Sequence, residues 1–244
     1  MKTYIWSLPT RIFHWLLVIG VIGALFTHED EIINIHVAFG FMIFFLLIFR
    51  IIWGFIGPKY SKFKDFPVSI RKLKEEAKDF GIDEQRHAGH NPFASIIILL
   101  ILIDTILTVL SGITLMSSHG YGISVLSMPD KIETIEEIHG TFAYTLVGLF
   151  CIHILGNIID LLIHKKHTAL WSIFTGNKNI EGESVKLKIG NKIQAIIFLL
   201  FAIFVFASNA IMQRIDTFQF KKNREALEKK EKVEEERHHD GKHD

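Results

Sequence analysis

Residues 137–164, EIHGTFAYTLVGLFCIHILGNIIDLLIH, form an apolar run with His139 near one end and His153 fourteen residues later. Each helical residue turns about 100° and climbs about 1.5 Å, so fourteen steps end about 40° short of four full turns, roughly 21 Å along the axis. The two imidazoles therefore share one helix face at two depths. The run is long enough to cross a bilayer of about 30 Å, where ionisable side chains are costly enough to indicate function.

The composition is typical of an integral membrane protein, because 49% of the 244 residues are hydrophobic and they lie in long uninterrupted runs. The 27 Lys and Arg nearly balance the 26 Asp and Glu, so the net charge gives no indication of a nucleic-acid partner. The single cysteine, Cys151, excludes an internal disulfide, an iron–sulfur cluster and Cys-x-x-Cys-His attachment of c-type haem. Any haem must then be held by coordination alone.

The apolar runs predict an all-α, polytopic transmembrane bundle, with a four-helix core and a fifth helix after it. The expected spans are 11–26, 33–56, 92–116, 137–164 and 192–212. A short surface helix is expected at 69–80. The chain divides into a transmembrane domain at 1–180, an additional helix at 191–213 and a charged tail at 214–244 that is partly helical and partly disordered.

The loops alternate in charge along the chain. Segments 59–91 and 165–190 are basic, whereas 27–31 and 117–136 are acidic. The positive-inside rule therefore places the amino terminus and the basic loops in the cytoplasm. Five spans then leave the tail outside, although its many basic residues fit that side badly.

Four histidines form two pairs when their depths are compared in this topology. His14 begins the first span at its cytoplasmic end, and His36 begins the second span at its outer end. His36 then lies at the depth of His139, and His14 at the depth of His153. Two pairs, each from two helices, suit two b-type haems stacked across the membrane, because an iron ligated by two imidazoles is suited to moving electrons.

A purely structural role and a zinc site each account less well for these histidines. One isolated histidine in a membrane helix is commonly hydrogen-bonded to backbone, but four in depth-matched pairs make a structural role a weak alternative. A zinc site needs three or four converging ligands, whereas these pairs are about 20 Å apart. Small residues also follow the outer pair by one turn, Gly40 and Ala143, and would leave room for a macrocycle.

Several motifs together resemble the family of bacterial cytochrome b561 and nickel–iron hydrogenase cytochrome b. They are SLPTRIFHW, IHVAFGF…LIFRIIWGFIGP, GHNPF and the paired histidines, and the likeness covers residues 1 to about 180. The resemblance implies a four-helix di-haem core that exchanges electrons between the quinone pool and a partner protein, such as a hydrogenase or a cytochrome c type subunit. It also implies that four histidines are the axial ligands of the haems: His14, His36, His139 and His153.

Polar residues besides the four histidines lie in or beside the spans. Arg50, near the cytoplasmic end of the second span, is expected to bind a haem propionate or to snorkel to the interface. Asp104, in the third span, is expected to be a neutral acid hydrogen-bonded to a neighbouring helix, with a proton route for quinone chemistry as the alternative. His87 and His90 are expected at the surface, with quinone-site or capping roles as the alternatives.

The sequence thus predicts a b-type cytochrome subunit that relays electrons between quinone and a redox partner protein in a respiratory chain. The alternative is a transporter, or a haem- or metal-handling membrane protein, whose histidines bind cargo transiently. A stand-alone quinol oxidase would need an open coordination position for oxygen, which the histidine pattern does not indicate.

Overall fold

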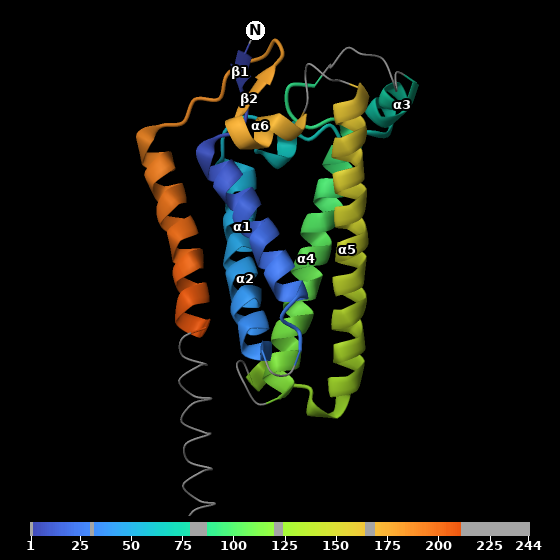
Figure 1. Ribbon diagram of the computed structural model, residues 1–244, viewed down its shortest axis with the longest axis vertical. Helices are drawn as coiled ribbons and strands as arrows, with labels where there is room; N and C mark the ends of the chain where they lie inside the picture. The colour runs from blue at the N-terminus through green and yellow to red at the C-terminus, as the bar shows by residue number, and fades with distance from the viewer. Residues whose placement is uncertain (1, 30–31, 79–86, 120–123, 164–168, 211–244) are drawn as a thin grey trace, which may run out of the picture.

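The computed structural model describes residues 2–29, 32–78, 87–119, 124–163 and 169–210. Within them, five helices are long and apolar enough to cross a membrane, which confirms the predicted all-α bundle (Figure 1). They are α1 (Leu8–Leu25), α2 (Ile33–Ile56), α4 (Pro92–Ser118), α5 (Ile132–Ile163) and the 189–210 helix (Ile189–Ala210). The predicted tail at 214–244 lies outside the described residues.

Proline and asparagine set where the helices begin. Pro92 occupies the first turn of α4, where its missing N–H removes no helical hydrogen bond. The side chain of Asn91 accepts a hydrogen bond of 2.7 Å from the Ala94 backbone N–H and so caps that helix. Pro9 lies in the first turn of α1 in the same way. These ends explain why the predicted and observed starts of α4 coincide.

The spanning helices pack in two pairs, α1 beside α2 and α4 beside α5 (Figure 1). One apolar cluster, which includes Val21, Ile101 and Leu146, joins the two pairs. A second cluster joins α1 and α2 to the 189–210 helix. Three phenylalanine pairs between α2 and that helix add ring contacts: Phe39 with Phe206, Phe45 with Phe201 and Phe49 with Phe198. The fifth helix therefore packs on the outside of the bundle, against α2.

Short elements cover one end of the bundle. They include α3 (Ile70–Lys78), α6 (Ala169–Thr175), strand β1 (Lys2–Tyr4) and strand β2 (Asn177–Asn179). The strands pair antiparallel, with Thr3 opposite Lys178, and tie the amino terminus to the segment after α6. The sequence pattern does not predict this strand pair. Single 3₁₀ turns occur at Phe63–Asp65, Ser124–Leu126 and Pro129–Lys131.

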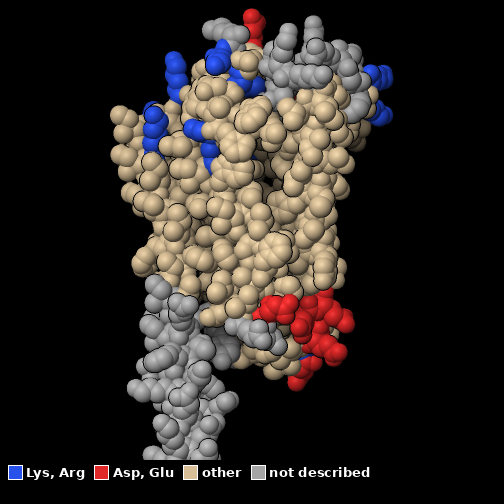
Figure 2. Space-filling view, in the orientation of Figure 1, with Lys and Arg blue, Asp and Glu red and all other residues tan. Residues whose placement is uncertain are grey.

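Charged side chains separate to the two ends of the molecule (Figure 2). Lysines and arginines gather at the end that carries β1 and β2, which we call the basic end. Acidic side chains gather at the opposite end, where α5 begins with the exposed residues Glu133, Glu136 and Glu137. The described parts of the basic loops thus lie together at one end, as the charge alternation predicts.

Candidate functional site

The outer histidine pair is brought together by α2 and α5. His36 lies in the first turn of α2, and His139 lies two turns into α5. Their ring centroids are 6.0 Å apart, and the ring planes are 81° from parallel. A metal–imidazole bond of roughly 2 Å plus a ring half-width of about 1 Å, counted twice, requires about 6 Å between the ring centres of two axial imidazoles. The observed separation therefore fits one iron atom held between the two rings.

Backbone carbonyls orient both rings of this pair. The Nδ1 atom of His36 lies 2.8 Å from the carbonyl oxygen of Ala24, and Nδ1 of His139 lies 3.0 Å from that of Thr108. A carbonyl oxygen only accepts, so Nδ1 carries the proton in each ring. The unprotonated Nε2 of each imidazole is then available as a metal ligand, in the arrangement by which a second hydrogen bond fixes the tautomer of a ligating histidine.

Helix α4 forms the wall behind His139. The hydroxyl of Ser111 lies 3.0 Å from Nδ1 of His139, and that hydroxyl also bonds the carbonyl of Thr108 at 2.8 Å. At Gly112, a Cβ atom would lie only 3.0 Å from Cε1 of His139. The ring therefore packs directly on the backbone of α4 at this glycine. By contrast, the position of Gly40 faces open space, as expected for a residue that leaves room for a macrocycle.

The inner pair consists of His14 in α1 and His153 in α5, and the two side chains lie within electrostatic range of each other. Nδ1 of His14 is buried without a hydrogen-bond partner, so this ring holds an unused polar atom that a ligand group can satisfy. Nε2 of His153 lies 3.2 Å from the side-chain nitrogen of Asn157, which also bonds the His153 carbonyl at 2.8 Å. For Nε2 of His153 to ligate a metal, the Asn157 side chain must therefore give up its contact with Nε2. It can keep its bond to the His153 carbonyl.

His90 is half-buried, so it is not the exposed surface histidine that the sequence predicts. Its ring packs between Trp6, with centroids 4.7 Å apart, and Phe66, with centroids 5.1 Å apart. Burial, followed by electrostatic interaction with Arg50, Lys178, His153 and His14, lowers the pKa of His90 to about 3. His90 is therefore neutral at physiological pH and lies beside the inner pair.

Arg50 folds toward the loop that follows α2. One guanidinium nitrogen donates to the Ser61 carbonyl at 3.1 Å, and the guanidinium lies over the Phe63 ring, 4.7 Å from its centroid. Arg50 has further N–H donors beyond this bond. His90 lies within electrostatic range of Arg50 and of both inner histidines. A half-buried guanidinium with spare donors in this region fits the predicted contact with a haem propionate.

Lys178, on β2, is a second cation in this region, and the sequence pattern does not single it out. Only 5% of the residue is exposed, and its Nζ donates to the His87 carbonyl at 2.8 Å. Burial lowers the Lys178 pKa to about 8, against the opposing charge of Asp160. His87 itself is half-buried, and its Nε2 donates to Glu76 of α3 at 2.9 Å. His87 thus helps to hold the basic end together.

Asp104 lies in α4 and is buried, with 8% of the residue exposed. Its Oδ2 has no hydrogen-bond partner, so the predicted bond to a neighbouring helix is not made by this oxygen. Asp104, Thr108 and Ser111 follow one another at helical spacing. This polar stripe is the sequence signal that could have identified Thr108 and Ser111 as partners of His139.

Among the described residues, no three His, Cys, Asp or Glu side chains come together in a group that could hold a metal ion. The histidine-rich carboxyl terminus lies outside those residues. The donor set here is instead two imidazoles per site, without carboxylate or thiolate ligands. Paired imidazoles are the axial ligands of a six-coordinate haem iron, so the residues present fit a haem better than a bare metal ion.

Comparison with protein families gives one match, to the family described as prokaryotic cytochrome b561, over residues 5–176. The matched range contains all four histidines and ends before the 189–210 helix. No curated protein and no solved structure matches the chain.

Proposed function

Because the chain belongs to the prokaryotic cytochrome b561 family, and is therefore a multi-pass membrane b-type cytochrome of electron transfer, we propose that it holds two haems by four histidines. His36 and His139 ligate the outer haem, and His14 and His153 the inner one. The observation that supports this assignment most directly is the separation of 6.0 Å between the rings of His36 and His139, each oriented by a carbonyl at Nδ1.

A haem held by two imidazoles would supply one-electron transfer, without an open coordination position for oxygen. The chain's own residues hold the group and set its surroundings. The Ala24 and Thr108 carbonyls orient the outer imidazoles, and Gly112 lets His139 sit against α4. At the inner site, the guanidinium of Arg50 would supply positive charge for a propionate.

The charge separation supports an orientation. The basic end, with the amino terminus, faces the cytoplasm, and the acidic end at the start of α5 faces outward, in the bacterial inner membrane. The outer haem then lies near the acidic face and the inner haem near the basic face. Electrons move between a membrane quinone and a redox partner protein, either a hydrogenase or a cytochrome c type subunit.

The test is a haem count and a redox titration of the purified full chain. Two haems per chain and two reversible low-spin components, both reduced by added quinol, are expected for this relay. Substoichiometric haem without a reversible redox spectrum would instead support the alternative of a transporter or haem-handling protein. Co-purification from native membranes, followed by identification of the bound protein, tests which redox partner is used.

A further inference from the structure

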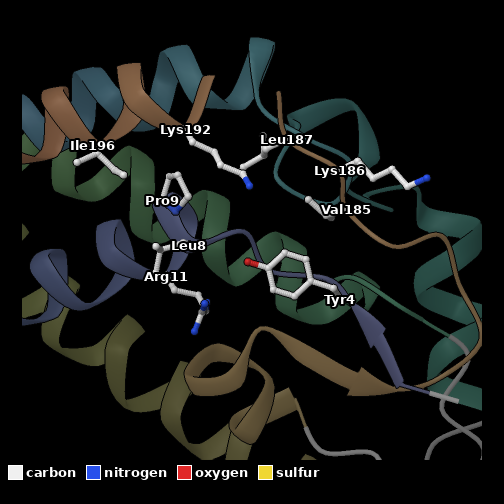
Figure 3. Close-up of a pocket in the computed structure, with 9 residues that line it drawn as sticks. All are labelled: Tyr4, Leu8, Pro9, Arg11, Val185, Lys186, Leu187, Lys192 and Ile196. Atoms are coloured by element: carbon white, nitrogen blue, oxygen red, sulfur yellow. The ribbon is translucent and has the colours of Figure 1, made fainter. Parts of the chain in front are cut away.

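A cavity of about 550 Å³ opens at the basic end, between the start of α1 and the start of the 189–210 helix (Figure 3). Much of its wall is apolar, from residues that include Leu8, Leu187 and Ile196. Its far wall, from Val185 to Ile196, comes from sequence beyond the family match at 5–176. The cavity is therefore built partly from the segment that distinguishes this chain from the family core.

The polar groups of the cavity are cationic or neutral. Its walls include Tyr4, Arg11, Lys186 and Lys192, and no Asp or Glu is among the nine residues that line it. Figure 3 shows the Lys192 ammonium and the Tyr4 hydroxyl turned toward the middle of the group, whereas Lys186 extends away from it. The Arg11 guanidinium bonds the Phe174 carbonyl, which lies at the second groove described below, so Arg11 contributes positive charge between the two. The cavity thus offers donors and positive charge to an anion.

A second groove, of about 280 Å³, runs on the other flank of α1 and shares Leu8 and Arg11 with the cavity. Apolar residues line the rest of it, among them Ile12, Leu16 and Ile19. Two apolar channels therefore lie on either side of one turn of α1, with a cation between them. Because α1 crosses the membrane, both channels are at a position where lipid chains are available.

We propose that an anionic phospholipid of the leaflet at the basic end binds at this site. Its phosphate contacts Lys192, Tyr4 and Arg11, and its two acyl chains occupy the two grooves beside Leu8. Basic pockets between transmembrane helices bind anionic headgroups in this way. A free phosphate ion would satisfy the cations but leave most of the apolar wall unfilled, so the lining favours a lipid. The bound lipid would fix the 189–210 helix against α1, independently of the haems.

The test is native mass spectrometry of the purified full chain in detergent, titrated with phosphatidylglycerol, phosphatidylcholine or inorganic phosphate. One phosphatidylglycerol should bind at least about fivefold more tightly than phosphatidylcholine. Lys192→Gln should weaken phosphatidylglycerol binding about fivefold, the factor expected for one basic side chain near an anionic lipid. Lys188→Gln, which removes an exposed lysine one turn away that does not line the cavity, should change it less than about twofold.

Tyr4→Phe provides a second variant that keeps the ring and the β1 backbone and removes only the hydroxyl. It should weaken phosphatidylglycerol binding at least about twofold, as expected for one lost hydrogen bond. Equal binding of the two lipids, an equal loss in Lys188→Gln, displacement of the lipid by inorganic phosphate, or unchanged binding in both site variants would each overturn the proposal. Monodisperse elution of every variant confirms that the folded chain is being compared.

Discussion

The rings of His36 and His139 lie 6.0 Å apart, and each donates its Nδ1 proton to a carbonyl of a third or fourth helix. His36 on α2 bonds Ala24 near the end of α1, and His139 on α5 bonds Thr108 within α4. All four helices of the core therefore take part in one small site.

The proposed pairing makes a prediction about redox components. Removing one axial imidazole leaves a five-coordinate iron that turns high-spin or loses its haem. His36→Ala and His139→Ala should therefore abolish the same component in a potentiometric titration followed by absorbance. His14→Ala and His153→Ala should abolish the other component.

The outcome that contradicts this pairing is specific. If His36→Ala and His153→Ala removed one shared component, the pairing by depth would be refuted even though the protein remained a cytochrome. The double variant His36→Ala/His139→Ala serves as the control, because it should retain one haem and one component, as the single variants do.

Gly112 offers a finer test of the outer site. A Cβ at this position would lie 3.0 Å from Cε1 of His139, so Gly112→Ala should push the imidazole away from α4. We expect the outer haem to be held about fivefold or more weakly, if the clash costs about 1–3 kcal/mol, and so to be lost more readily on purification. Gly190→Ala, at the start of the 189–210 helix, is the control, because its Cβ meets nothing within 4 Å and it lies outside the helices that carry the histidines, so it should leave the haem content unchanged. Equal haem loss in the two variants would count against the close packing of His139.

The outer histidine pair was predictable because both of its determinants are local. Helical periodicity places His139 and His153 on one face, and loop charges set the relative directions of the helices. The carbonyl partners Ala24 and Thr108 were not predictable in the same way. Every helical residue has a carbonyl, and only the packing of one helix against another decides which carbonyl meets a ring.

The contacts at the basic end were even less predictable from the sequence. The GHNPF motif marks the start of α4, yet nothing near His90 in sequence indicates that its ring packs against Trp6 and Phe66. The β1–β2 pair likewise joins residues from the two ends of the core domain. Such contacts between distant segments leave no periodic pattern in the chain, so the sequence does not predict that His90 is half-buried.

Asp104→Asn should preserve both haem spectra, because the buried Oδ2 has no hydrogen-bond partner to lose and an amide is close in shape to a neutral acid. The chain should be as stable as the wild type or slightly more so in thermal unfolding, since a buried group that can ionise is replaced by one that cannot. The measurement is absorbance of the reduced and oxidised protein beside the rate of quinol-driven reduction. A marked slowing with intact spectra would favour the proton-route alternative, and loss of a haem would contradict our placement of Asp104 outside the haem sites.

The burial of Lys178 leads to a prediction of how the stability of the folded protein depends on pH. Burial lowers its pKa from 10.5 to about 8, with Asp160 acting in the opposite direction. Below about pH 8 the lysine is protonated in both states, so the folded protein bears the full cost of the buried charge. Between about pH 8 and 10.5 the unfolded chain keeps a proton that the folded chain has released, so stability rises with pH, by at most ~3 kcal/mol.

Lys178→Met removes this titration while keeping a long apolar side chain, so the pH dependence is read as a difference between two proteins. The melting temperature of the wild type relative to the variant, followed by circular dichroism in detergent, should increase from pH 8 to pH 10 and stay constant from pH 6 to pH 7.5. Lys188→Met, at an exposed position, is the control and should track the wild type throughout. The buried bond from Lys178 to the His87 carbonyl joins β2 to the loop before α4, so any shift should appear in the main unfolding transition. If the difference in melting temperature between the wild type and Lys178→Met stayed constant from pH 8 to 10, Lys178 would keep its proton in the folded protein. Its ammonium would then be less desolvated than the 5% exposure of the residue indicates.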